Sequence, residues 1–378
     1  MTRALRMSVV CDLLEEQWPS MDLLAEMLLT HAGRDERVVA TPVRPMLAPR
    51  VSRLPLLSGR ERFAFNADRI LNRMWDVPRA ARRAVQDSDV FHVCDHSYAY
   101  AVHALPTERV GVYCHDLDAF RCLLEPRQEP RPLWFRAMSR RLLEGLKKAR
   151  VVFFSTSAVR DSILRYGLID ERKLVQARYG VSPEFCPDPA DVLPADHPIH
   201  GLEGRPFLLH VGSCIPRKRI DVLLDVFAQV HRENPEVRLI QVGGAWTDDQ
   251  RAQLERLGLA RFLVQLPRAG RTELAKFYRR AAMVLMPSDA EGFGLPVIEA
   301  LSCGAMVVAS DIPTLREAGG DAVSFVPVAD LPAWTRVVSE LLRDASHAPP
   351  RERRLTHSGQ FSWAAHAKVI IDTYLALS

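Results

Sequence analysis

Two glutamates, Glu291 and Glu299, have the residue type and spacing best suited to chemistry in this sequence. They lie in the run Ser-Asp-Ala-Glu-Gly-Phe-Gly-Leu-Pro-Val-Ile-Glu-Ala-Leu, which follows an apolar stretch at 283–286. Proline is tolerated in the first turn of a helix, so the run predicts a helix that begins near Leu295–Pro296. The helix start offers free backbone N–H groups and positive partial charge, which suit oxygen-rich anionic ligands. We therefore expect Glu291 to bind sugar hydroxyls and Glu299 to bind the hydroxyls of a ribose.

The ordinary alternative is that both glutamates only stabilise the helix start and remain solvated. A basic motif upstream, His-Val-Gly-Ser-Cys-Ile-Pro-Arg-Lys at 210–218, favours the functional interpretation. Gly212 and Ser213 follow a predicted strand and allow close backbone approach, and Arg217 and Lys218 are predicted to open the next helix. Two cations after such a turn are typical of a diphosphate site. The alternative interpretation is that Arg217 and Lys218 are only a pair of surface cations beyond a tight turn.

A histidine follows a predicted strand in the first half of the chain. His115 lies in Val-Gly-Val-Tyr-Cys-His-Asp, just past the strand end, and Asp95 and His96 follow the preceding strand. Ligands of α/β sheets bind at such strand ends. The alternative is that His115 only hydrogen-bonds Asp116 or a neighbouring loop.

The loop after the first predicted strand contains no glycine. It reads Leu-Leu-Glu-Glu-Gln-Trp-Pro-Ser at 13–20, so the Gly-x-Gly-x-x-Gly pattern of a dinucleotide-dependent oxidoreductase is missing. Ser20 is the type of residue that caps a helix N-terminus. We expect Trp18 and Ser20, together with His96 and Asp116, to contact an acceptor.

The chain as a whole predicts two α/β domains. Its 378 residues exceed one typical core, and short apolar runs alternate with helix-length segments, which indicates parallel sheets covered by helices on both faces. The predicted strands are 7–11, 90–93, 111–113, 151–154, 206–211, 237–242, 262–266, 283–286 and 305–309. Residues 186–205 are rich in Pro, Asp and His and are predicted to be a linker. The predicted parts are therefore 1–185, the linker 186–205, 206–360 and a terminal helix at 361–378.

Composition indicates the cellular compartment in which the protein is expected to work. No apolar run approaches the ~18 residues of a membrane span, and the N-terminal residues are too irregular for a signal peptide. The seven cysteines are scattered without a Cys-x-x-Cys pair, which predicts a reducing cytoplasm and neither a disulfide framework nor a zinc site. No acidic or histidine set has metal-ligand spacing, so we expect no metal.

Charge is unevenly distributed between the two halves. Residues 1–185 carry 29 Lys and Arg against 23 Asp and Glu, and the remainder carries 21 against 23. The excess in the first half favours attraction to anionic lipid headgroups or to a pyrophosphate-linked acceptor. The alternative is a solvated surface in a chain whose composition favours arginine, since only six of its fifty basic residues are lysine.

The motifs at 210–218 and 288–301 resemble the donor site of the family-four retaining glycosyltransferases, which have the GT-B fold. The resemblance extends from about residue 90 to the C-terminus. It implies two Rossmann-like domains facing across a cleft, with the terminal helix crossing back to the first domain. It also implies that Arg217 and Lys218 bind the diphosphate, that His115 faces the donor sugar, and that no metal or other cofactor takes part. The donor-binding set that it implies comprises Gly212, Ser213, Arg217, Lys218, Gly243, Leu266, Glu291, Gly292, Phe293, Gly294, Leu295, Val297 and Glu299.

The resulting prediction is a retaining, metal-independent hexosyltransferase. It would use a GDP- or UDP-linked sugar, with mannose favoured, and a glycan or polyprenyl-linked acceptor, in cell-surface polysaccharide or glycolipid synthesis. Catalysis would rest on His115, Glu291, Arg217 and Lys218. We expect a cytoplasmic protein, peripheral on the inner face of the plasma membrane, that binds no nucleic acid. The alternative is a non-catalytic sugar-nucleotide-binding protein of the same fold.

Overall fold

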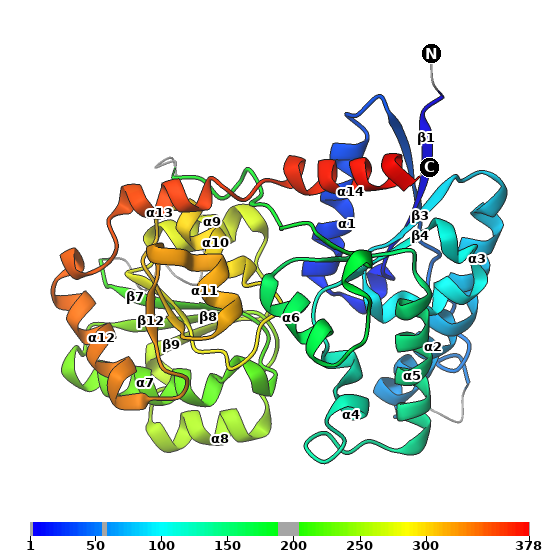
Figure 1. Cartoon of the computed structure of the whole chain (residues 1–378). Helices are drawn as coiled ribbons and strands as arrows, with labels where there is room; N and C mark the ends of the chain where they lie inside the picture. Colours follow the sequence, from blue (N-terminus) through cyan, green and yellow to red (C-terminus); the bar gives the residue numbers. More distant parts are fainter. Residues whose placement is uncertain (1–2, 55–58, 188–203, 378) are drawn as a thin grey trace. The chain divides into compact units, whose positions relative to one another are not determined.

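The computed structural model describes residues 3–54, 59–187 and 204–377, and the chain divides into two compact units (Figure 1). The first unit comprises Met1–Gly180 and Trp363–Ser378, and the second comprises Val181–Ser362. The first segment of the first unit thus ends at Gly180, before the predicted domain boundary at 185. Phe185 belongs to the second unit because its ring packs against Tyr278 of that unit, with ring centroids 5.8 Å apart. Most of the predicted linker, 188–203, lies outside the described residues.

The first unit is built on a parallel sheet of six strands. They are β1 (Leu5–Val10), β2 (Val38–Val43), β3 (Val90–Val93), β4 (Val110–Cys114), β5 (Val151–Phe154) and β6 (Leu174–Gln176), in the spatial order β2-β1-β3-β4-β5-β6. The main helices are α1 (Pro19–Ala32), α2 (Glu61–Leu71), α3 (Val77–Arg83), α4 (Arg121–Leu124), α5 (Leu133–Lys148), α6 (Ser157–Arg165) and α14 (Trp363–Leu377). Shorter turns that matter below are η1 (Leu14–Glu16), the π-helical η3 (Asn72–Asp76) and η5 (His96–Ala104).

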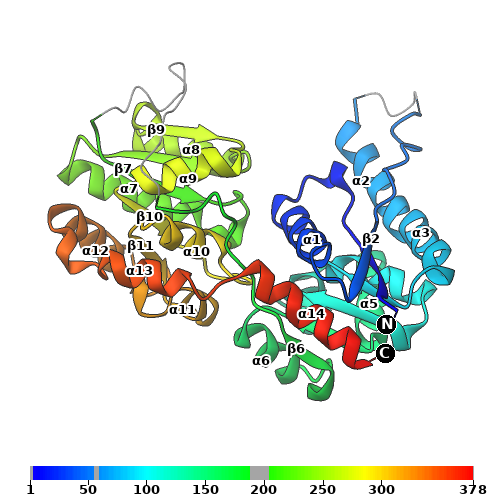
Figure 2. The same ribbon diagram turned by 90° about the horizontal axis from the view of Figure 1, so that it is seen from above.

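Helix α14 completes the first unit although it is distant in sequence, and Figure 2 shows it alongside that unit. The Tyr374 hydroxyl donates to the backbone carbonyl of Phe91 at 3.0 Å and lies 3.1 Å from His92 Nδ1. Gly111 lies under this hydroxyl, and any Cβ at that position would clash with it. These contacts anchor α14 directly on the central strands.

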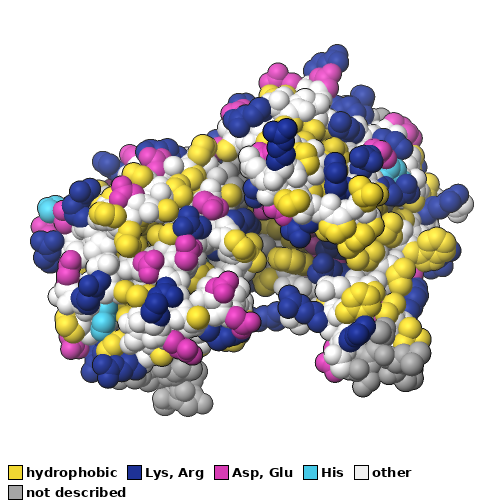
Figure 3. All heavy atoms as spheres, turned by 90° about the horizontal axis from the view of Figure 1, so that it is seen from below, with side chains coloured by type: hydrophobic (Ala, Val, Ile, Leu, Met, Phe, Trp, Pro, Cys, Tyr) yellow, Lys and Arg dark blue, Asp and Glu magenta, His cyan; other side chains and the backbone are white. Residues whose placement is uncertain are grey.

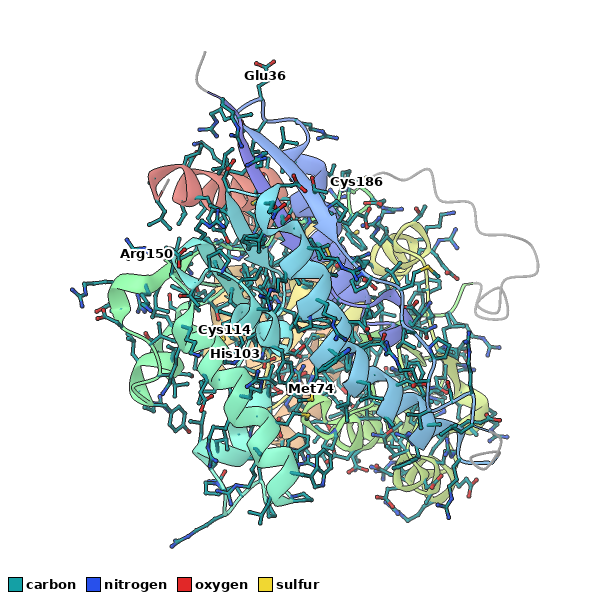
Figure 4. All side chains as sticks on the ribbon, turned by 90° about the vertical axis from the view of Figure 1, so that its right-hand side faces the viewer. Glu36, Met74, His103, Cys114, Arg150 and Cys186 are labelled. Atoms are coloured by element: carbon teal, nitrogen blue, oxygen red, sulfur yellow. The ribbon has the colours of Figure 1, made fainter. Side chains whose placement is uncertain are left out.

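Local contacts also fix the surface helices of this unit. His103 of η5, labelled in Figure 4, lies with Nε2 2.9 Å from the backbone carbonyl of Arg141 in α5.

Helix α1 begins at Pro19 with Trp18 as its N-cap, so the prediction that Ser20 caps the helix was wrong. Proline suits the first helical position, and it shifts the helix start towards the N-terminus.

The second unit repeats the architecture. Its strands are β7 (Phe207–Val211), β8 (Arg238–Val242), β9 (Leu263–Leu266), β10 (Met283–Met286), β11 (Val307–Ser310) and β12 (Ser324–Val326), all parallel, in the order β12-β11-β10-β7-β8-β9. Its helices are α7 (Ile220–Glu233), α8 (Asp248–Leu257), α9 (Arg271–Arg280), α10 (Leu295–Ser302), α11 (Pro313–Gly319), α12 (Leu331–Arg343) and α13 (Arg351–Ser358).

Each sheet contains one point where the strand order reverses direction. In the first unit it lies between β1 and β3, and in the second it lies between β7 and β10. At such a point the loops after the two strands diverge to opposite faces of the sheet, which leaves a crevice at the carboxyl ends where ligands of α/β proteins bind. The predicted site motifs at 212–218 and 288–294 follow β7 and β10, so they lie at the switch point of the second unit.

Candidate functional site

Glu291 is the centre of the switch-point site in the second unit. Its side chain is only 6% exposed, and Lys218 Nζ and Arg217 Nη1 donate to it at 2.5 and 3.0 Å. The Ser288 hydroxyl donates to Glu291 Oε1 at 2.7 Å. The structure thus brings together three residues that were predicted to act in one site, from the loops after β7 and β10. Sequence reasoning gave Ser288 no role, although it stands in the same motif.

The charges in this group are unequal. Burial alone raises the pKa of Glu291, but Lys218 and Arg217 outweigh it and hold the pKa below its usual range. Arg217 Nη1 also donates to the carbonyl of Ala290 at 2.8 Å. Two cations against one carboxylate leave one net positive charge, which suits an anionic ligand. Both cations lie in or beside the short turn η10 (Pro216–Lys218), and helix α7 starts only at Ile220, so the prediction that they open the helix was wrong.

Close backbone approach explains the glycines beneath this site. Gly243 has φ 108°, and a Cβ there would lie 2.8 Å from the Gly212 carbonyl oxygen. Gln241 Nε2 joins the two loops by donating to the carbonyls of Gly212 and Gly243 at 2.9 and 2.7 Å. The Gly243 N–H donates to the carbonyl of Leu266 at 2.9 Å, at the end of β9. Gly212 and Gly243 therefore allow the loops after β7 and β8 to pack closely. Contact of Gly243 or Leu266 with a donor stays a prediction.

His210 is a buried member of the site that sequence reasoning missed. Its Nδ1 lies 2.9 Å from the Leu285 carbonyl, which fixes Nδ1 as the donor and leaves Nε2 as an acceptor. Nε2 is buried and has no hydrogen-bond partner among the described residues. A Cβ on Gly212 would lie 3.2 Å from it. Burial lowers the pKa of His210 to about 4, so the ring is neutral next to Lys218.

The start of α10 has the geometry that the motif predicted. Gly294 has φ 100°, and the helix begins at Leu295, which is half-buried. Phe293 is buried and packs edge-on against Phe361 of the same unit, with centroids 5.7 Å apart. The Val297 side chain is fully buried in the hydrophobic core and its N–H donates to the Gly294 carbonyl, and its contact with a donor stays a prediction.

Glu299 lies inside α10 and is 8% exposed. The Tyr278 hydroxyl of α9 donates to its Oε2 at 3.1 Å, a contact that the sequence did not predict. Burial raises the pKa of Glu299 to about 7. Its carboxyl therefore titrates near neutral pH, which bears on any role in binding ribose hydroxyls.

In the first unit, His115 is buried and held on both sides of its ring. Nε2 lies 2.8 Å from the Cys94 carbonyl, and Nδ1 is hydrogen-bonded to the Tyr179 hydroxyl. Burial lowers the pKa of His115, so the ring is neutral. The Cys94 carbonyl belongs to the loop after β3, so this contact is the one to a neighbouring loop that the simpler alternative expected. Both ring nitrogens are occupied within the first unit, and the role of His115 towards a donor sugar stays a prediction.

The predicted acceptor residues fall into two groups. His96 Nδ1 accepts from the His115 N–H at 3.3 Å, and His96 Nε2 lies 3.7 Å from Asp116 Oδ1, so these residues form one cluster. Trp18 and Ser20 instead lie at the start of α1, where Trp18 is 46% exposed.

The residues that the structure describes lie in the ranges 3–54, 59–187 and 204–377. No group of three or more His, Cys, Asp or Glu side chains within them could hold a metal ion. No helix within them is both long and apolar enough to cross a bilayer.

Comparison of the sequence with known proteins gives a family. Residues 194–359 match the family described as glycosyl transferases group 1. O-antigen chain mannosyltransferase B of Escherichia coli is 30% identical over 286 residues, which cover 74% of this chain and 72% of that protein. D-inositol 3-phosphate glycosyltransferase of Segniliparus rotundus is 38% identical over 178 residues, which cover 44% of this chain and 39% of that protein.

Comparison with solved structures gives the fold. HepE from Anabaena, solved in complex with UDP and glucose, superposes with a TM-score of 0.75 at 15% identity, covering 98% of this chain and 100% of that one. Sucrose-phosphate synthase from Thermosynechococcus elongatus gives 0.71 at 18% identity, covering 99% of each chain. These likenesses agree with the two parallel sheets and with the contacts of Arg217 and Lys218 to Glu291. The chain belongs to the group 1 glycosyltransferases and has the GT-B fold.

Proposed function

We propose that this chain is a retaining hexosyltransferase that moves mannose from a nucleotide-diphosphate sugar to a glycan or polyprenyl-linked acceptor in cell-surface polysaccharide or glycolipid synthesis. The observation that carries the proposal is the convergence of Arg217, Lys218 and Ser288 on Glu291 at the switch point of the second unit. The name of the Escherichia coli relative supports mannose and a surface polysaccharide. The UDP in the HepE complex keeps UDP beside GDP as a candidate nucleotide.

In this proposal the second unit stabilises the leaving group. The bond from the sugar C1 to the diphosphate oxygen breaks, a bond from C1 to the acceptor oxygen forms on the same face, and the acceptor proton passes to a diphosphate oxygen. Arg217 and Lys218 stabilise the charge on that diphosphate without a metal. Glu291 and the backbone near Gly292 hold the sugar, and Glu299 binds the ribose. His115 of the first unit faces the sugar.

Nucleotide binding and product stereochemistry test the proposal directly. In a thermal unfolding assay with GDP, UDP and ADP, a nucleotide at 100 times its Kd should add ~2.7 kcal/mol of stability. NMR of the product formed from GDP-mannose should show that the anomeric configuration is kept. Stabilisation by no nucleoside diphosphate would refute the donor site, and an inverted product would refute retention.

A non-catalytic sugar-nucleotide-binding protein is the alternative. Both proteins would bind the nucleotide, so binding alone does not separate them. A transferase should hydrolyse the donor slowly when no acceptor is added, and a binding protein should not. Release of free mannose from GDP-mannose, abolished in Lys218→Met, decides between them.

We further propose that the first unit contacts an anionic membrane surface. In the stretch formed by α2 and η3, polar side chains are buried and aromatic ones are exposed. Asp68 and Asn72 are buried against the loop at 48–52. Phe63 and Trp75 are 63% and 57% exposed. Met74, labelled in Figure 4, lies on the same stretch and is 42% exposed. Figure 3 shows hydrophobic side chains with Lys and Arg near them on this unit. Exposed aromatics beside cations suit an anionic interface.

Vesicle sedimentation tests this surface. The full chain should bind vesicles of phosphatidylglycerol and phosphatidylcholine, and Phe63→Ser with Trp75→Ser should weaken binding without changing nucleotide affinity. Trp18→Ser is the matched control, since it removes an exposed tryptophan elsewhere on the unit. Equal sedimentation of all three proteins would remove α2 from the proposal.

A further inference from the structure

A cavity of about 720 Å³ lies in the first unit, at the amino ends of β1, β3 and β4. Leu5, Val90 and Val110, the first residues of these strands, line it. Its volume falls in the range of small-molecule pockets, about 300–1,000 Å³. Since a strand rises ~3.3 Å per residue, Val110 lies about 16 Å from His115, beyond the other end of β4. The cavity is therefore separate from the switch point of this unit.

Two arginines of the lining, Arg109 and Arg150, carry charges that no neighbouring acid neutralises. Arg109 Nη1 donates to the Ser88 carbonyl at 3.2 Å, and its guanidinium lies 5.9 Å from the centre of the Phe91 ring, so the side chain is held in place. Arg150, labelled in Figure 4, is exposed, and its backbone N–H donates to the Val110 carbonyl at 2.8 Å. Within the ranges 3–54, 59–187 and 204–377 neither guanidinium forms an ion pair.

The acidic side chains of the lining are Asp89 and Glu108. Asp89 accepts from the Arg3 guanidinium at 3.2 Å, and from the Arg6 backbone N–H and guanidinium at 2.8 and 3.1 Å. Glu108 is exposed and forms no ion pair with another described residue. Together with Arg6, the lining therefore has four cations against two carboxylates, and this excess favours an anionic ligand.

The last turn of α14 makes another part of the lining apolar. It contributes Tyr374, Leu375 and Leu377, and in Figures 1 and 2 this end of α14 lies beside the start of β1. The Tyr374 hydroxyl already donates to the Phe91 carbonyl, so this residue adds mainly apolar surface. Leu377 is 41% exposed. Because Arg150 and Leu377 are both exposed, the cavity can be reached from solvent, and it offers cations and apolar surface together.

We propose that this cavity binds a small amphiphilic anion, whose phosphate or carboxylate head contacts Arg109 and Arg150 and whose short alkyl or acyl chain packs against Leu375 and Leu377. The ligand joins the end of α14 to the first residues of β3 and β4. It therefore stabilises the docking of the helix that Tyr374 anchors on the sheet. This ligand is free in solution and takes no part in sugar transfer, so the inference goes beyond the proposed function and does not depend on it.

Isothermal titration of the full chain with three probes tests the ligand class. Hexyl phosphate has both the charge and the chain, inorganic phosphate has only the charge, and 1-hexanol has only the chain. Each buried methylene should strengthen binding about fourfold. We therefore expect hexyl phosphate to bind at least about tenfold more tightly than either of the others. No saturable binding of hexyl phosphate, or equal affinity for it and one of the simpler probes, would overturn the proposal.

Variants locate the bound probe. Arg150→Met and Leu377→Ser each change an exposed side chain, so both proteins should fold, and each should weaken hexyl phosphate binding by about fivefold. Arg127→Met is the matched control, since Arg127 is an exposed arginine between α4 and α5, outside the lining. Lys218→Met should also bind hexyl phosphate normally. Equal affinities of Arg150→Met and Arg127→Met, or weakening in Lys218→Met alone, would place the probe elsewhere and refute the site.

Hydrogen exchange measures the effect on α14 and separates a free ligand from a lipid surface. Hexyl phosphate at saturation of the natural chain should slow amide exchange in 363–377, and the same concentration should slow it less in Arg150→Met. Phosphatidylglycerol vesicles should leave exchange in this segment unchanged. Unaltered exchange with bound hexyl phosphate would contradict the proposed link to α14, and protection by vesicles but not by hexyl phosphate would assign the cavity to a membrane lipid instead.

Discussion

The two units share a sheet topology and differ in the charge at its switch point. In the second unit, Arg217 and Lys218 enclose the single carboxylate of Glu291. In the first, Asp12 and Asp95 lie near His115, whose pKa is lowered by burial, and the nearby Arg73 is engaged by Glu16. Topology thus places the polar side chains, but the loops decide their chemistry. The switch point of the second unit therefore suits an anionic ligand better than that of the first.

The largest expected effect comes from removing a cation of the second unit. Lys218→Met should weaken GDP or UDP binding by about 10- to 100-fold, because a charge-assisted hydrogen bond is worth about 1.5–3 kcal/mol. Isothermal titration measures this. Arg219→Ala is the control, since Arg219 pairs with Asp221 instead. Equal affinities in the two variants would mean that the cationic character of this switch point does not serve nucleotides.

Removing the neutral histidine of the first unit should leave nucleotide binding alone. We expect His115→Ala to keep the Kd for GDP or UDP within about twofold and to lower unfolding free energy by about 1–3 kcal/mol, because the Cys94 carbonyl and Tyr179 hydroxyl lose a buried partner. Chemical denaturation measures the stability. Transfer rates taken where the variant is folded then show whether His115 acts on the sugar; an unchanged kcat would make it a packing residue.

The smallest effect concerns pH and Glu299. Since its pKa is about 7, nucleotide affinity should rise by up to about tenfold from pH 6 to 8 if the ionised carboxyl binds ribose. The same raised pKa means that the native state holds this proton more tightly than the unfolded chain. That stabilisation is fully present below pH ~4.5 and is lost as pH rises through ~7. Glu299→Gln should flatten the affinity profile and be the more stable protein at pH 8; parallel profiles for both proteins would exclude Glu299 from ribose binding.

Local patterns in the sequence predicted well the elements that carry the candidate site of the second unit. The buried run 283–286, the glycines and the proline fixed β10, the turn and the start of α10, because all of these signals lie within one short segment. The strands that were missed are β2, β6 and β12, each at a sheet edge. Edge strands are partly exposed and carry a weaker apolar pattern, as the half-buried Leu174–Gln176 shows.

Pairings between distant segments could not be predicted in the same way. Tyr278 reaches Glu299 from another helix, and His210 gains its meaning only from the Leu285 carbonyl on the neighbouring strand. The motif did not reveal which face of α10 packs against the core, and Val297 lies on that face. Asp12 and Asp95 stand after strands that were both predicted, but only the strand order β2-β1-β3 makes them neighbours.

The terminal helix has a consequence for biosynthesis. Because Trp363–Leu377 belongs to the first unit, a ribosome must complete all of Val181–Ser362 before that unit can receive Tyr374 over Gly111. The second unit is therefore a continuous segment that can fold while the first still waits for its last helix. Exchange of the first unit between relatives would likewise require two segments of the gene, 1–180 and 363–378, to be moved together.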